Sequence, residues 1–226
     1  MNAPSYQALL VSGELSDRVE RAQALLSSCT VCPRHCGVDR PDGVRGYCRG
    51  GLLPEVSSYG PHIGEEPPLG GSYGSGTIFF SGCNMRCIFC QNYEISHLRH
   101  GTEVSCERLA EMMLELQDHR CHNINLVSPG HFVPQILEAV FIAAGKGLHI
   151  PLVYNTGTYD SIETLRLLDG VVDIYMPDAK FMDGEVARRL GNAPDYPERM
   201  QAALREMHRQ VGDLKIGGDG LARRGL

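Results

Sequence analysis

Three cysteines in one short segment are the residues of this sequence best suited to chemistry. Cys83, Cys87 and Cys90 occur in the run GCNMRCIFC with the spacing C-x3-C-x2-C. Cysteine thiolates are the usual ligands of iron–sulfur clusters, and three of them leave one iron of a four-iron cluster free to bind a small molecule. A zinc site normally takes four protein ligands, so the alternative is a closed zinc site that borrows a histidine such as His97.

A second group of cysteines lies closer to the N-terminus, at Cys29, Cys32, Cys36 and Cys48. Four thiolates suit either a closed tetrahedral zinc site or a second iron–sulfur cluster, and unligated thiols are the remaining alternative. Residues 29–75 are rich in proline and glycine and show little hydrophobic periodicity. We therefore expect a bound metal with a structural role to order this segment.

Composition narrows the class of protein. The chain has 226 residues and a formal net charge of -6, which argues against binding nucleic acid by bulk electrostatics. No apolar run approaches the roughly 20 residues that a membrane-spanning helix needs. The first ten residues do not resemble a signal peptide, so we expect a cytoplasmic protein without a membrane partner. In a reducing compartment, grouped cysteines indicate metal ligands, whereas the isolated Cys106 and Cys121 are interpreted as buried apolar filler.

Strands and helices alternate from residue 76 onward, after a first amphipathic helix over 16–28. Apolar runs predict strands over 77–81, 123–127, 150–154 and 171–176, and the helical spacing of apolar residues predicts helices over 105–118, 133–144 and 197–211. Asp160 is the predicted N-cap of a further helix, with Glu163 completing a capping box. This alternation predicts a parallel sheet, whose functional residues gather at the carboxyl ends of the strands.

Polar motifs follow each of the later strands. They are Ser128, Gly130 and His131 after the second strand, Asn155 and Thr156 after the third, and Met176, Asp178 and Lys180 after the fourth. A plain turn before a helix, and an ordinary Asp–Lys pair, are the alternatives for the first and last of these motifs. Glu65 and Glu66 either shape a substrate entrance or lie in a solvated loop.

The segment that contains Cys83, Cys87 and Cys90 resembles the signature of a known family. The pattern C-x3-C-x-aromatic-C, with Phe89 as the aromatic residue, resembles the signature of the radical SAM superfamily. The runs CPRHCGV, GEEPP, VYNTGTYDS, DIYMPDAK and NAPDYPE resemble the pyruvate-formate-lyase-activating-enzyme-like (PflX-like) group within it. This resemblance extends from about residue 15 to the end of the sequence.

The resemblance implies an α/β fold, a partial (β/α)6 barrel, with a [4Fe-4S] cluster on Cys83, Cys87 and Cys90. It also implies S-adenosylmethionine (SAM) as a cofactor, cleaved reductively to a 5′-deoxyadenosyl radical that abstracts hydrogen. The positions expected to bind SAM are Phe89, Ser128, Gly130, Asn155, Thr156, Met176, Asp178 and Lys180. A reductant such as flavodoxin or ferredoxin would supply the electron, and the substrate expected by analogy is a glycine of a partner protein. The rival hypothesis is a non-catalytic iron–sulfur or zinc module for electron transfer or docking.

The strand count predicts a division of the chain and an incomplete barrel. Residues 1–75 form the Cys-rich N-terminal segment, with a helix and metal-binding loops, and residues 76–226 form the barrel. Four strands are predicted where relatives have six. Residues 213–226 are predicted to form a short excursion of the chain and a turn, and not a long core strand. We therefore expect a C-terminally truncated barrel, with the fourth strand as an exposed edge and weak or absent SAM cleavage.

Overall fold

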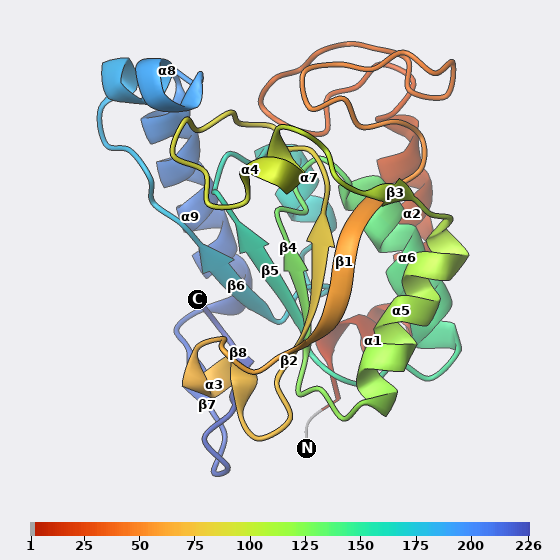
Figure 1. Cartoon of the computed structure of the whole chain (residues 1–226). Helices are drawn as coiled ribbons and strands as arrows, with labels where there is room; N and C mark the ends of the chain where they lie inside the picture. Colours follow the sequence, from red (N-terminus) through yellow and green to blue (C-terminus); the bar gives the residue numbers. More distant parts are fainter. Residues whose placement is uncertain (1–2) are drawn as a thin grey trace.

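A six-stranded sheet forms the centre of the computed structural model, which describes residues 3–226 (Figure 1). Its strands run in the order β3-β1-β2-β4-β5-β6. Strands β2, β4, β5 and β6 are mutually parallel, whereas β1 and β3 are antiparallel additions at one edge. The bounds are β1 (Glu55–His62), β2 (Ser75–Phe80), β3 (Thr102–Glu103), β4 (Ile124–Val127), β5 (Leu152–Thr156) and β6 (Ile174–Pro177). The parallel-dominated α/β sheet predicted from the sequence is confirmed, with strand ends shifted by up to three residues.

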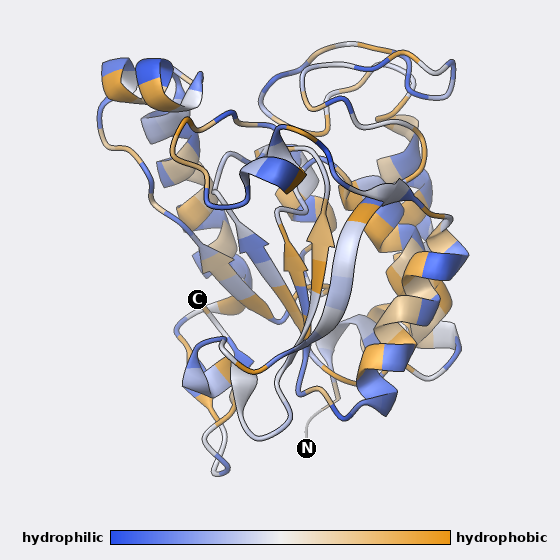
Figure 2. Ribbon diagram, viewed as in Figure 1, coloured by the Kyte–Doolittle hydropathy of each residue, from blue (hydrophilic) through white to orange (hydrophobic). Residues whose placement is uncertain are grey.

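The helices are α1 (Ser5–Ser12), α2 (Glu14–Ala24), α3 (Pro67–Gly70), α4 (Tyr93–Ser96), α5 (Cys106–Asp118), α6 (Val133–Gly145), α7 (Ile162–Leu167), α8 (Gly184–Gly191) and α9 (Tyr196–Val211). The longer helices pack around the sheet with their apolar sides inward (Figure 2), whereas α4 has no buried residue and α8 packs on α9. In α5 the Ser105 hydroxyl accepts a hydrogen bond from the Arg108 backbone N–H, which caps the helix as serine commonly does. Helix α6 packs between α2 and α5, which explains why most of its residues are buried.

The strand β1 lies in a segment for which the sequence predicted only loops. It pairs antiparallel with β2, so that Val56 lies opposite Phe80 and His62 opposite Ser75. Only its first two residues, Glu55 and Val56, are buried, and the strand contains Gly60 and Pro61. A half-exposed strand with these residues has no apolar alternation to reveal it. Residues 55–62 therefore join the same sheet as the predicted barrel.

The prediction that Asp160 caps a helix is wrong. Helix α7 begins at Ile162, its N-cap residue is Ser161, and no side chain caps it. The Asp160 side chain instead accepts hydrogen bonds from the Tyr154 hydroxyl at 2.8 Å and the Thr156 hydroxyl at 2.7 Å. These two buried hydroxyl donors satisfy the buried carboxylate.

The end of the chain covers part of the sheet edge that was expected to be exposed. The hairpin of β7 (Lys215–Ile216) and β8 (Ala222–Arg224) matches the predicted short excursion and turn. After it, Gly225 forms a parallel bridge with Ile174 of β6. The Gly225 N–H donates to the Asp173 carbonyl, and the Tyr175 N–H donates to the Gly225 carbonyl, each at 3.0 Å.

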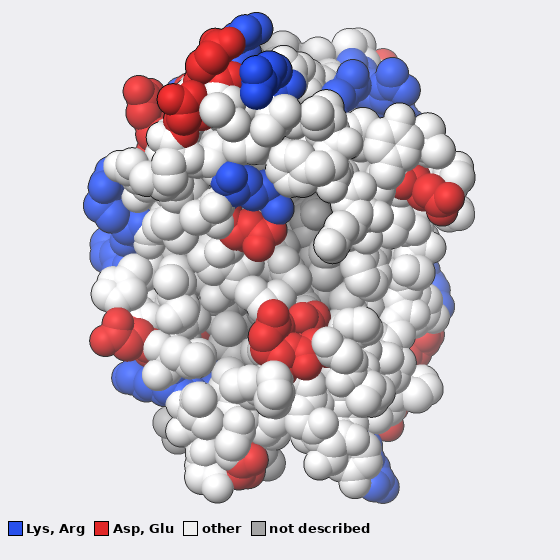
Figure 3. Space-filling view, turned by 60° about the vertical axis from the view of Figure 1, so that its left-hand side comes forward, with Lys and Arg blue, Asp and Glu red and all other residues white. Residues whose placement is uncertain are grey.

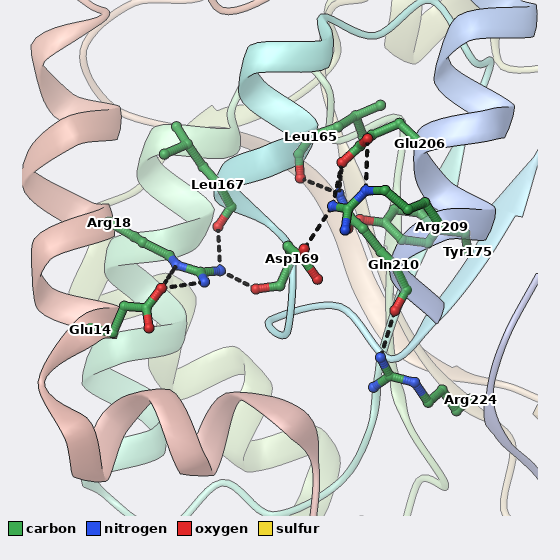
Figure 4. Close-up of polar contacts among 10 residues, drawn as sticks. All are labelled: Glu14, Arg18, Leu165, Leu167, Asp169, Tyr175, Glu206, Arg209, Gln210 and Arg224. Carbon is green, nitrogen blue, oxygen red and sulfur yellow. Dashed lines mark hydrogen bonds and ion pairs between the residues drawn. The ribbon is translucent and has the colours of Figure 1, made fainter. Parts of the chain in front are cut away.

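A polar network fixes α9 against the rest of the fold (Figure 4). Arg209 of α9 forms ion pairs with Asp169 and Glu206, each at 2.7 Å. Arg18 of α2 donates to the backbone carbonyl of the same Asp169, and Gln210 donates to Glu206 at 2.9 Å. The loop after α7 is thus held from both sides.

Within residues 3–226, no helix is long and apolar enough to span a bilayer.

Candidate cofactor-binding site

A pocket at the carboxyl ends of the parallel strands brings most of the predicted site residues together. Its volume is about 450 Å³, within the range of small-molecule sites. The pocket is lined by Cys83, Cys87, Cys90, Phe89, Ser128, Gly130, Asn155, Thr156, Asp178 and Lys180. Of the residues predicted to bind SAM, Met176 alone lies elsewhere: it packs against an apolar cluster that contains Leu69 and Ile174.

The loop that carries the pocket cysteines depends on close backbone packing. Gly82 follows β2 with a φ of 78°, and a Cβ atom there would lie 2.8 Å from the carbonyl oxygen of Cys48. Only glycine fits this approach without strain. Farther along the loop, Met85 is buried with Phe181 and Tyr196 in a separate apolar cluster. The two anchors fix the cysteine loop at both the strand and the α8–α9 side.

The thiols of Cys83 and Cys87 in this loop are neutral unless a metal replaces their protons. Burial raises the pKa of the Cys83 thiol to about 12, and burial also raises the pKa of Cys87, against the opposing charge of Lys180. Such thiols become thiolates when a metal replaces the proton. The Met85 backbone N–H donates to the Cys83 sulfur at 3.3 Å, a contact that would stabilise a metal-bound thiolate.

The side chains near these thiols indicate whether a single metal ion or an iron–sulfur cluster fits the site. Within residues 3–226, no three His, Cys, Asp or Glu side chains converge as ligands of a single ion. The three thiolates of a four-iron cluster bind separate irons, so their sulfurs do not need to converge on one point. His97 lines the pocket but pairs with the Ser96 hydroxyl at 2.9 Å, and that hydroxyl contacts the Cys90 sulfur at 3.2 Å. The donor set of three thiols therefore fits a [4Fe-4S] cluster.

The ends of β4 and β5 form the second wall of the pocket. The Ser128 N–H donates to the Asn155 carbonyl at 2.8 Å, and Ser128 itself has a left-handed φ of 56°. A Cβ atom at Gly130 would lie 2.6 Å from the Asp160 carboxylate. Because Asp160 also binds the Thr156 hydroxyl, one buried carboxylate positions both strand ends. Backbone and hydroxyl groups held in this way can bind the polar end of SAM.

The third wall is an Asp–Lys pair held by a tyrosine. Lys180 Nζ lies 2.5 Å from the Asp178 carboxylate. The Tyr196 hydroxyl accepts the Lys180 backbone N–H at 2.9 Å and lies 2.8 Å from the carbonyl oxygens of Gly157 and Asp178. Tyr196 was not identified from the sequence, because nothing in its local pattern distinguishes it from an ordinary first-turn residue of α9.

His131, which follows β4, has a structural role. His131 is 1% exposed, and burial lowers its pKa to about 4, so the ring is neutral. Its Nε2 pairs with the Ser81 carbonyl at 2.8 Å and therefore carries the proton. His131 joins the end of β2 to the start of α6 and does not line the pocket.

An acidic group lies at the other end of the pocket. Glu65 lines it, which favours the substrate-entrance interpretation, and accepts a hydrogen bond from the buried Asn125 amide at 2.7 Å. Burial and the neighbouring Glu66 raise the pKa of Glu65 to about 7. Figure 3 shows acidic side chains gathered beside the hollow on this face of the molecule.

The raised pKa of Glu65 predicts that ionisation of this group lowers the stability of the fold as the pH rises. Since the folded-state pKa lies above the ordinary value of 4.5, the stability that Glu65 contributes is full below pH 4.5 and is lost as the pH rises through 7. The pKa of Glu66 is lowered, so it is ionised throughout this window. We expect Glu65→Gln to gain about 1 kcal/mol over wild type between pH 5 and pH 8, a value reduced by solvent screening of this half-exposed group. Urea unfolding at both pH values measures this, with the exposed Glu20→Gln as the control; equal responses of the two variants contradict it.

The four N-terminal cysteines lie near the pocket loop. The loops that follow α2 pass over the carboxyl end of the sheet (Figure 1). Cys29, Cys32 and Cys48 are buried there, Cys36 is partly exposed, and none of the four is in a disulfide. His35, which lies between Cys32 and Cys36, is exposed.

Comparisons with known proteins agree with this site. Residues 77–221 match the family model described as the radical SAM superfamily, and the chain belongs to that superfamily. It is therefore a member of a family of enzymes that use a [4Fe-4S] cluster and SAM.

Two uncharacterized proteins of Methanocaldococcus jannaschii are similar to it. One is 34% identical over 188 residues, covering 79% of this chain and 53% of the relative. The other is 27% identical over 196 residues, covering 78% of this chain and 53% of the relative. The chain thus spans about half the length of the curated relatives it matches.

Proposed function

We propose that this chain is the cofactor-binding part of a radical SAM enzyme of the activating-enzyme type, with a glycine of a partner protein as the substrate group. The observation that carries the proposal is the single pocket in which Cys83, Cys87 and Cys90 meet the polar ends of three strands. When bound, the cluster and SAM supply the electron and the 5′-deoxyadenosyl radical of this chemistry. The substrate class rests on the resemblance to the activating-enzyme-like group alone.

Each wall of the pocket has a role in this proposal. Three thiolates hold the cluster, and Asn155 and Thr156 bind the polar end of SAM beside it. Lys180 offsets the SAM carboxylate, with Asp178 orienting its ammonium group at 2.5 Å. Phe89, which is 53% exposed and packs edge-on against Phe181, shields the cluster side of the pocket from water.

The hollow opens to solvent at its acidic end (Figure 3), which leaves room for a segment of a partner protein to reach the pocket. A flavodoxin or ferredoxin is the proposed reductant.

Reductive cleavage of SAM tests the proposed function. The protein is reconstituted anaerobically with iron and sulfide, reduced, and incubated with SAM, and 5′-deoxyadenosine and methionine are measured by chromatography. We expect both products in equal amounts, at the low rate predicted for a barrel with four parallel strands, together with cluster absorbance that oxygen bleaches. Cluster formation without either product would instead support a non-catalytic module for electron transfer or docking.

A further inference from the structure

A buried arginine without a carboxylate partner lies beside the N-terminal cysteines. Arg40 is 1% exposed. Its Nη1 donates to the His131 carbonyl at 2.8 Å, and its Nη2 lies 3.7 Å from the Cys48 sulfur. Its Nε has no hydrogen-bond partner among residues 3–226. A guanidinium stays charged in proteins, and an uncompensated buried charge costs several kcal/mol. The position of Arg40 therefore calls for a nearby negative charge.

The groups around Arg40 leave thiolates as the source of that charge. His131 is neutral, because burial lowers its pKa and its Nε2 pairs with the Ser81 carbonyl. The hydrogen bonds of Arg40 within the described part of the chain reach a backbone carbonyl and a sulfur, and no carboxylate. Cys48 is the side chain that its second nitrogen approaches.

The other three thiols gather around the same place. Cys29, Cys36 and Cys48 lie close enough to the buried Cys32 thiol to act on it electrostatically. The Tyr47 N–H points at the Cys36 sulfur at 3.5 Å, and the Gly50 N–H points at the Cys48 sulfur at 3.4 Å. Backbone N–H groups directed at sulfur are typical of metal-bound thiolates.

Glycine is required where these loops approach the sulfurs. A Cβ atom at Gly46 would lie 2.8 Å from the Cys36 sulfur. A Cβ atom at Gly50 would lie 3.2 Å from Nη1 of Arg40 and 3.4 Å from the Cys48 sulfur. The backbone is thus wrapped closely around the sulfurs and the guanidinium together.

We propose that Cys29, Cys32, Cys36 and Cys48 hold an anionic metal–thiolate centre whose charge is partly balanced by Arg40. Four thiolates around one Zn²⁺, or around an oxidised four-iron cluster, leave a net charge of about -2. One buried guanidinium offsets half of that charge. A single zinc ion would require the four thiols to turn toward a common centre, because no three ligating side chains converge in residues 3–226.

The centre also braces the loop of the pocket cysteines. The Cys48 carbonyl is the group against which Gly82 packs. Arg34, between the second and third of the N-terminal cysteines, donates from Nε to the Asn84 carbonyl at 2.8 Å. Its guanidinium lies 3.9 Å from the centre of the Tyr47 ring. Ordering the N-terminal loops would therefore support the loop of the pocket cysteines at Gly82 and at Asn84.

Metal binding by a chain without the pocket thiols tests the proposal. The full chain with Cys83, Cys87 and Cys90 replaced by alanine is reconstituted separately with zinc, and with iron and sulfide. After gel filtration we expect about one zinc or about four irons per chain, and the form retained identifies the metal. Retention of neither overturns the proposal. This variant is not asked to cleave SAM, so its result stands apart from the test of the proposed function.

The role of Arg40 is tested in the same background. We expect Arg40→Met to weaken metal affinity by roughly 10–100-fold in competition with a chelator, the usual effect of removing a group that supports metal ligands. Arg40→Lys keeps the charge and should recover most of the affinity. The control is Arg45→Met, because Arg45 is in the same segment but is exposed and pairs with Glu103 at 2.6 Å. Equal affinities of Arg40→Met and Arg45→Met overturn the assigned role, and circular dichroism of each variant verifies that the fold is retained.

Discussion

Replacing Cys87 by alanine should abolish SAM cleavage and remove the iron of the pocket cluster. Cys87 is 8% exposed and is one of three thiols that line the pocket. A four-iron cluster with three protein ligands has no fourth thiolate in reserve, so loss of one ligand removes its support. We expect 5′-deoxyadenosine release to fall by more than about 100-fold and bound iron to fall by about four atoms per chain. Iron analysis and chromatography of the reconstituted protein measure the two effects.

A matched control separates this effect from general loss of a buried thiol. Cys121 is 3% exposed, belongs to the main apolar core, and lies outside the pocket. Cys121→Ala removes a small apolar side chain and should leave both iron content and turnover close to wild type. If Cys87→Ala behaved like Cys121→Ala, the assignment of the pocket cluster would be wrong. Iron retained by the N-terminal thiols is subtracted by using the same reconstitution for the variant that lacks all three pocket cysteines.

The parts of the fold that were predictable are those with a local signal. The apolar runs that became β2, β4 and β5 are buried in the sheet, and the stripe of α5 faces the core. Strand β1 gave no such signal because most of its residues are exposed and polar. Helix α8 was missed for a related reason, since only Ala187 and Gly191 are buried in it.

The residues of the candidate site likewise divide into those that a local sequence pattern predicts and those that it does not. Cysteine spacing predicts candidate ligands, and polar residues after apolar runs predict strand ends, so the residues that line the pocket were largely predictable. Arg40 and Tyr196 act through groups that are distant in the sequence, namely the carbonyl of His131 and the loop at Lys180. Asp160 was misassigned because its local pattern equals that of a helix cap, and only the sheet places two hydroxyls beside it.

The second large effect is expected at Asp160. Its buried carboxylate accepts hydrogen bonds from Tyr154 and Thr156 and lies where a Cβ atom at Gly130 would clash. Asp160→Ala leaves two buried hydroxyls without their acceptor and opens a small cavity under the pocket wall. Each unsatisfied buried group costs about 1–3 kcal/mol, so we expect the free energy of unfolding to fall by roughly 3 kcal/mol. Urea unfolding measures this fall.

The same substitution should weaken SAM binding, because Thr156 and Gly130 both line the pocket and lose their common support. Asp160→Asn keeps one carbonyl acceptor and should lie between wild type and Asp160→Ala in both stability and SAM affinity. A double-mutant cycle with Tyr154→Phe isolates the hydrogen bond to the tyrosine hydroxyl, since residues in contact show coupling of about 0.5–3 kcal/mol. Additive effects of Asp160→Ala and Tyr154→Phe, or SAM affinity unchanged in a folded Asp160→Ala protein, would show that Asp160 does not position the pocket wall.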